Sequence, residues 1–246
     1  MNSERYAVLD GIRGIAVINM VIYHGIWDLV YLFGYDWLWF QSLGAFFWQQ
    51  YICCTFIFLS GFCQPFGKKK LKKGRTVFVL GFLISILICI IMPEERIYFG
   101  ILTLIGSCIL IAIPMESFLE KFSPIMGLII SVFAFVFTRN VNQGYLGFGT
   151  WNIVSLPDNW YCNTFTAYLG FPMAGFHSAD YFPLIPWLFL FIAGYFTQRL
   201  FTQKELLLYL KPQRAGAIEW IGRHSLAIYL IHQPALYFLL DIILTV

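Results

Sequence analysis

The chain has 246 residues, of which 59% are hydrophobic, 20% aromatic and only 12% charged, with a net charge of +3. A water-soluble domain of this length could not cover so much apolar surface with polar groups. The composition therefore excludes a soluble enzyme, a disordered chain and a nucleic-acid-binding module, and it predicts an all-α, polytopic integral membrane protein.

Seven apolar runs approach or exceed the length that crosses a bilayer as a helix. They cover residues 8–33, 44–66, 76–92, 97–115, 124–138, 182–201 and 218–245. A further apolar stretch, 160–177, is interrupted by Gly170, Pro172 and Gly175, and we expect it to be a re-entrant segment. Residues 1–246 are thus expected to form a single membrane domain, a bundle of about seven transmembrane helices.

The placement of basic residues predicts the orientation of this bundle. With seven crossings and a cytoplasmic N-terminus, the cytoplasmic side carries Arg5, the Lys68–Arg75 cluster, Lys121, Arg199, Lys204, Lys211 and Arg214. A full crossing at 160–177 would move the last four to the opposite side, so residues 139–181 are expected to be extracytoplasmic. We therefore predict a multi-pass protein of the cell membrane (inner or plasma membrane) whose C-terminus is extracytoplasmic.

The first predicted helix carries four titratable residues, Asp10, Arg13, His24 and Asp28. Arg13 and His24 are eleven positions apart, about three helical turns, so both project from nearly the same face. Asp10 precedes Arg13 by three residues and Asp28 follows His24 by four, which are pairing distances on a helix. Such groups are costly inside a membrane and predict a functional site. The alternative is a structural ion pair at Asp10–Arg13 and a helix–helix hydrogen bond from His24.

These residue types favour particular chemistry. A histidine with a carboxylate one turn away has the parts of a general base and its orienting partner. An arginine near the cytoplasmic face suits a phosphate-bearing ligand, because its planar guanidinium can bind phosphate with two hydrogen bonds. In the last predicted helix, His232 is expected either to contact a ligand or to bond a neighbouring helix, and Pro234 is expected to kink the helix.

The run LDGIRGIAVINMVIYH resembles the opening helix of the membrane acyltransferases. FIFLSGF at 56–62, YFGILTLIG at 98–106, DYFPLIPW at 180–187 and GRHSLAIYLIHQP at 222–234 extend the likeness in order along the chain. Together they are similar to bacterial relatives of the heparan-alpha-glucosaminide N-acetyltransferase catalytic domain. The resemblance implies transfer of an acetyl or other acyl group from cytoplasmic acyl-CoA, such as acetyl-CoA, to an amine or hydroxyl of an extracytoplasmic sugar or glycan.

The resemblance also suggests roles for single residues. Arg13, with Asp10, would hold the CoA phosphates, and His232 would contact the same co-substrate. His24 and Asp28 would be catalytic, His24 as general base or transient acyl carrier. On the acceptor side, Asp180 would either bind the sugar or complement the dipole of the helix that follows it. The other residues expected at the acceptor are Tyr181, Trp187 and His177.

The chain departs from the lysosomal member of this family at the proposed catalytic position. That enzyme has Asn where His24 stands, and its proposed catalytic His lies about a dozen residues later, where this chain reads Tyr35-Asp36-Trp37. Many relatives carry His in place of Thr103. No metal is expected, since the cysteines and histidines lack metal-ligand spacing. The oligomeric state is open, with a homodimer as one alternative. Because intramembrane His, Asp and Arg also build ion pathways, small-solute or proton-coupled transport is the alternative function.

Overall fold

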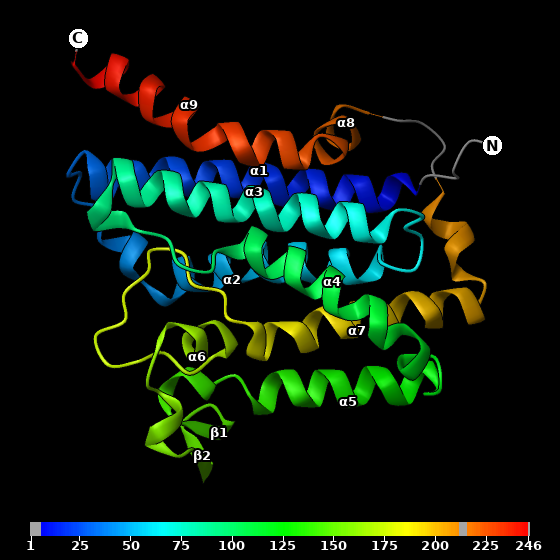
Figure 1. Cartoon of the computed structure of the whole chain (residues 1–246). Helices are drawn as coiled ribbons and strands as arrows, with labels where there is room; N and C mark the ends of the chain where they lie inside the picture. Colours follow the sequence, from blue (N-terminus) through cyan, green and yellow to red (C-terminus); the bar gives the residue numbers. More distant parts are fainter. Residues whose placement is uncertain (1–5, 212–215, 246) are drawn as a thin grey trace. The chain divides into compact units, whose positions relative to one another are not determined.

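The computed structural model describes residues 6–211 and 216–245. Arg5 and Arg214, two of the predicted cytoplasmic residues, lie outside the described residues. The chain divides into two compact units, one formed by its two ends, up to Phe56 and from Lys204, and the other by Ile57–Gln203. Figure 1 labels the elements of both units, which we describe in turn.

The seven predicted crossings are confirmed. The described residues contain seven helices that are long and apolar enough to span a membrane: Ala7–Leu32, Leu43–Phe62, Lys70–Ile91, Ile101–Leu119, Pro124–Gln143, Leu184–Gln203 and Ser225–Leu244. The last of them begins later than the predicted run 218–245, because the helix breaks at His224. None of these seven candidate spans falls within 160–177.

The first unit is built on helix α1 (Ala7–Trp27), which continues as a π-helical turn over Asp28–Leu32. A 3-10 turn (Leu38–Gln41) leads into α2 (Leu43–Phe62), and a second one (Leu206–Leu210) precedes α8 (Ala217–Arg223) and α9 (Ser225–Thr245). Val17, Met20 and Ile52 form a buried apolar core, against which side chains of α8 and α9 pack.

Helices α1 and α8 approach each other backbone to backbone. A Cβ atom added to Gly14 would overlap the carbonyl oxygen of Ile218, and one added to Gly222 would overlap that of Asp10. Small residues at helix crossings allow such close packing inside membranes, where no hydrophobic effect drives helices together. The two glycines therefore fix where α8 crosses α1.

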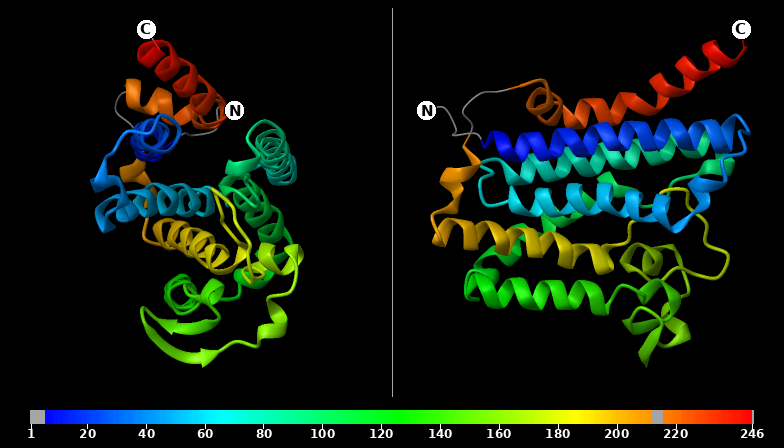
Figure 2. Two further views of the ribbon diagram at one scale, coloured as in Figure 1. Left: turned by 90° about the vertical axis from the view of Figure 1, so that its left-hand side faces the viewer. Right: turned by 180° about the vertical axis from the view of Figure 1, so that it is seen from behind.

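Helix α9 follows α1 over its first part and then diverges from it (Figures 1 and 2). Pro234 lies in the middle of this helix. A proline inside a helix removes one backbone hydrogen bond and clashes with the preceding turn, so the predicted change of direction at Pro234 has a local cause.

The second unit contains α3 (Lys70–Ile91), α4 (Ile101–Leu119), α5 (Pro124–Phe137), the short α6 (Thr164–Leu169) and α7 (Leu184–Gln203). Leu119, Ile192, Tyr195 and Phe196 form its buried apolar cluster. Short 3-10 turns occur at Pro93–Glu95, Val141–Gln143 and Asp158–Trp160. Lys70 and Glu116 form an ion pair of 2.5 Å, which joins the start of α3 to the last turns of α4.

Residues 139–181 contain a β-hairpin that the sequence did not predict. Strands β1 (Tyr145–Phe148) and β2 (Trp151–Ser155) pair antiparallel, with Tyr145 opposite Ser155. Phe148 packs against the end of α5, with ring centroids 5.6 Å from Phe137, and Figures 1 and 2 show the hairpin beyond that end. An apolar membrane composition masks strand signals this short. Whether the stretch 160–177 enters the membrane stays a prediction.

Candidate functional site

Two histidines meet between the first and last spanning helices. His24 of α1 and His232 of α9 lie edge to face, with ring centroids 4.9 Å apart and planes inclined by 66°. His232 is buried, with 8% of its surface exposed. The first-helix stripe predicted from spacing thus has a partner that is 208 positions away in the sequence and belongs to the same compact unit.

Asp28 lies beside this pair but bonds a different residue. Its side chain is fully buried, and its Oδ1 accepts a hydrogen bond from Nε2 of Gln233 on α9. The sequence predicted that Asp28 would orient His24, whereas the described hydrogen bond links Asp28 to α9. The sequence also predicted that His232 would bond a neighbouring helix. The helix–helix hydrogen bond is instead made by Gln233, the next residue in the chain. The only sequence signal for Gln233 was a second polar residue beside His232 in an apolar helix.

The cluster of His24, Asp28, His232 and Gln233, hereafter the histidine cluster, holds unsatisfied polar atoms. Oδ2 of Asp28, Nε2 of His232 and Oε1 of Gln233 are buried and have no hydrogen-bond partner among the described residues. A buried unsatisfied polar group costs about 1–3 kcal/mol. Three such atoms in one place are unusual in a folded protein and are typical of a site that receives a ligand.

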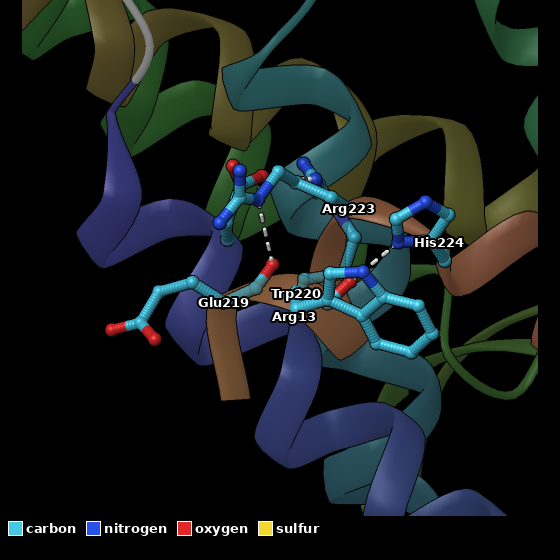
Figure 3. A network of polar contacts seen from close by, with 6 residues as sticks. Arg13, Glu219, Trp220, Arg223 and His224 are labelled. Atoms are coloured by element: carbon cyan, nitrogen blue, oxygen red, sulfur yellow. Dashed lines mark hydrogen bonds and ion pairs between the residues drawn. The ribbon is translucent and has the colours of Figure 1, made fainter. Parts of the chain in front are cut away.

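The N-terminal end of α1 carries the second part of the predicted stripe. Nη1 of Arg13 lies 2.9 Å from Oδ1 of Asp10, so the predicted ion pair is confirmed. Both side chains are partly buried, with 23% and 14% of their surfaces exposed. Figure 3 shows Arg13 where α1 and α8 pack, together with Glu219, Trp220, Arg223 and His224.

The α8 side chains in Figure 3 are held by local hydrogen bonds. Nε of Arg223 donates to the carbonyl of Glu219, at 3.2 Å, and Nδ1 of His224 lies 2.8 Å from the carbonyl of Trp220. The indole of Trp220 also packs on the His224 ring, with centroids 4.3 Å apart. All of these contacts are local to α8 and the residue that follows it. They satisfy Nε of Arg223 and Nδ1 of His224, so the positions of these side chains need no ligand to explain them.

The predicted acceptor residues all lie in the second unit. Oδ2 of Asp180 accepts a hydrogen bond from the backbone N–H of Ile101, at 3.1 Å, and so caps α4. The sequence placed this carboxylate at the start of the next helix in the chain. It caps α4 instead because the chain returns there: the N–H of Phe182 donates to the carbonyl of Phe99. The hydroxyl of Tyr181 donates to the carbonyl of Ala167.

Trp187 and His177 differ in exposure. Trp187 is buried, with 4% of its surface exposed. The guanidinium carbon of Arg139 lies 4.5 Å from the Trp187 ring centre, and the Phe135 ring packs at 5.6 Å. The indole thus contributes to the interior of this unit rather than to a surface that a sugar could reach. His177 is exposed.

Burial raises the pKa of the Asp180 carboxyl to about 6, and the hydrogen bond from Ile101 offsets part of this rise. Because the folded pKa exceeds the unfolded value near 3.9, folding favours the protonated form. The resulting stabilisation is complete below about pH 4 and is lost as the pH rises to about 6. We expect Asp180→Asn, which keeps an oxygen acceptor for Ile101, to raise stability at pH 7 by up to about 3 kcal/mol and to leave it unchanged at pH 4.

Thermal unfolding of the purified wild-type and Asp180→Asn proteins between pH 4 and pH 8 measures this effect. Replacing the exposed Asp158 by Asn in the same unit provides the control, and its unfolding should follow the wild type at every pH. If stability varied with pH in the same way in the wild type and in Asp180→Asn, the raised pKa of Asp180 would be contradicted.

Within the described residues, seven helices long and apolar enough to span a membrane, with a buried titratable cluster in the first and last of them, define a multi-pass membrane protein with an internal polar site. The family model for the catalytic domain of heparan-alpha-glucosaminide N-acetyltransferase matches residues 5–234, and the chain belongs to this family. The resemblance predicted from the sequence motifs is therefore confirmed. Comparison with curated proteins and with solved structures found no match.

Proposed function

We propose that this protein transfers an acetyl group from acetyl-CoA to an amine or hydroxyl of a sugar or glycan on the far side of the membrane. The observation that carries the proposal is the contact between His24 and His232 inside a buried cluster with unsatisfied polar atoms, in a member of an N-acetyltransferase family. In the proposed orientation the N-terminus is cytoplasmic, so the Arg13 end of α1 faces the acyl-CoA pool.

Arg13 is proposed to bind the phosphates of CoA. Asp10 engages Nη1 and thereby fixes the orientation of the guanidinium. Eleven residues of helix separate Arg13 from His24, a rise of about 16 Å along the axis. A ligand whose phosphates bind at Arg13 would therefore present its thioester deeper in the membrane, at the level of the histidine cluster.

His24 is proposed to act on the acceptor at that level. As general base, its imidazole takes the proton of the acceptor amine or hydroxyl while the acceptor attacks the thioester carbon. The C–N or C–O bond forms, the C–S bond breaks, and the sulfur leaves with the electron pair and finally takes the proton. In the alternative route, His24 first forms an acyl-imidazole and releases CoA, and the acceptor then displaces the imidazole.

The acceptor is proposed to bind near 177–181. His177 supports this placement because it is exposed. The Asp180 carboxylate and the Tyr181 hydroxyl already bond the backbone, so we assign them the support of this segment, with sugar contact as a second role. Trp187 is left out because it is buried. Heparan sulfate itself is not the expected acceptor, and small amino sugars are the first substrates to test.

The purified protein with acetyl-CoA and glucosamine provides the first test. Mass spectrometry should detect acetylated sugar, and acetyl-CoA should raise the temperature of unfolding. The absence of both effects, together with flux of a small solute through liposomes containing the protein, would favour transport instead.

Arg13→Gln is expected to weaken acetyl-CoA binding about 10- to 100-fold, because a hydrogen bond to a charged group contributes about 1.5–3 kcal/mol. Arg13→Lys should recover only part of the affinity, since an ammonium cannot bind phosphate with a planar pair of N–H groups. The shift of unfolding temperature with acetyl-CoA concentration measures these affinities. Lys204→Gln removes an exposed charge on the same predicted side and should bind as the wild type does. Equal affinities for Arg13→Gln and the wild type would remove Arg13 from the proposed site.

A further inference from the structure

The hydrogen bond of His232 fixes which of its ring nitrogens carries a proton. Nδ1 lies 2.7 Å from the carbonyl oxygen of Tyr229 on the same helix. A carbonyl only accepts hydrogen bonds, so Nδ1 is the donor and Nε2 of the neutral ring keeps its lone pair. Nε2 is buried and has no partner within the described part of the chain. The fold thus holds an unused proton acceptor in a membrane-spanning helix.

The neighbour of this ring is His24. The two ring centroids are 4.9 Å apart, and the edge-on arrangement directs ring atoms of one imidazole toward the other. Asp28 is the hydrogen-bond acceptor that the sequence predicted for His24, but its Oδ1 accepts a hydrogen bond from Gln233. His232 therefore takes the place beside His24 that the sequence assigned to a carboxylate.

We propose that His232 is the positioning residue of the reaction: when acetyl-CoA and the acceptor are bound, its Nε2, unpaired in the described part of this structure, accepts the N–H of His24 and so leaves the other nitrogen of His24 unprotonated for the acceptor. This inference rests on the proposed acetyl transfer. As the acceptor's proton reaches His24, the proton on the opposite nitrogen of His24 passes to Nε2 of His232. When the C–S bond breaks, the departing thiolate takes a proton from the pair, and both imidazoles return to their neutral forms.

The Asp28–Gln233 hydrogen bond supports this arrangement. It joins the π-helical turn that continues α1 to α9, at the residue next to His232, and therefore keeps the two helices in register. The bond between Nδ1 of His232 and the carbonyl of Tyr229 holds Nδ1 against its own helix, so Nε2 is the ring nitrogen that remains available. The two bonds together set the position and the tautomer of His232, while Nε2 stays available.

Two substitutions separate the role of Nε2 from that of Nδ1. His232→Asn keeps an amide group near Nδ1, which can still donate to Tyr229, and loses the atoms at Nε2. His232→Gln places an amide near Nε2, which can bond His24 but cannot take up a proton. His224→Asn is the matched control, because the Nδ1 of His224 also lies at a carbonyl of its own helix, 2.8 Å from Trp220, outside the proposed site.

We expect both His232 variants to lower kcat by about 100-fold or more, within the range of general acid–base catalysis. The KM for acetyl-CoA should stay within about threefold of the wild type, and acetyl-CoA should still raise the unfolding temperature. In mixtures of H₂O and D₂O, two protons in transit make the wild-type plot of kcat against deuterium fraction curved. The variants should give a straight line, which a merely structural loss would not produce.

Normal kcat in His232→Asn, or a reduced kcat with the wild-type curvature, would overturn the inference. If His232→Asn fails to fold, His232→Gln gives the same comparison. His224→Asn should match the wild type in kcat and in curvature. A wild-type protein that shows no acetyl transfer at all would instead overturn the proposed function, so the two failures are distinguishable.

Discussion

Replacing His24 by Ala or Gln is expected to lower acetyl transfer by about 10²- to 10⁴-fold, the range that general acid–base catalysis contributes. His24 is the titratable residue of α1 that contacts the buried His232, so no other imidazole of this helix can substitute for it. The rate of acetylated-sugar formation at saturating acetyl-CoA measures the effect. Binding of acetyl-CoA should be retained, because the proposed phosphate contact at Arg13 is about 16 Å away along the helix.

His224→Gln is the control for this loss, since His224 is exposed and outside the histidine cluster. Its rate should equal that of the wild type. Near-normal rates in both His24 variants would end the candidacy of this residue. Intact-mass measurement of the protein with acetyl-CoA and without acceptor separates the two routes: an added acetyl group on wild type, absent from His24→Ala, indicates the acyl-imidazole.

Gly222→Ala and Gly14→Ala are expected to destabilise the first unit by about 1–3 kcal/mol each, the usual cost of overpacking. In both positions the new methyl group meets a backbone carbonyl, of Asp10 or of Ile218, which cannot rotate away as a side chain could. The helices would have to separate where Arg13 lies. The unfolding temperature of the purified variants should fall, and the affinity for acetyl-CoA should fall with it.

Two other glycines of α1 serve as controls for Gly14. A Cβ atom at Gly11 would lie 3.8 Å from the nearest atom, in Glu219, and one at Gly25 would lie 3.7 Å from Leu236, both ordinary contacts. Because alanine is favoured over glycine in a helix by about 0.5–1 kcal/mol, these substitutions should be neutral or stabilising. Equal losses at Gly11, Gly14 and Gly25 would show that α1 rejects alanine at any of its glycines and that the close crossing with α8 has no particular importance.

The sites of proposed chemistry are arranged along one helix for a physical reason. Helix α1 carries Arg13 near one end and His24 eleven residues on, and α8 and α9 contact these two levels in turn. A break at His224 lets consecutive C-terminal helices do this: α8 crosses α1 tightly, and α9 then follows it. The histidine cluster therefore depends on the two ends of the chain packing into one unit.

The sequence by itself determined the membrane class, the seven spans, the family and the Asp10–Arg13 pair. Each of these rests on composition, run length, ordered motifs or a three-residue helical spacing, which are local properties. The tertiary structure alone decided the partners across the chain: Gln233 for Asp28, His232 for His24, α4 for Asp180, and a buried place for Trp187. A polar side chain in an apolar helix must find a hydrogen-bond partner, but its own sequence does not say which distant segment supplies one.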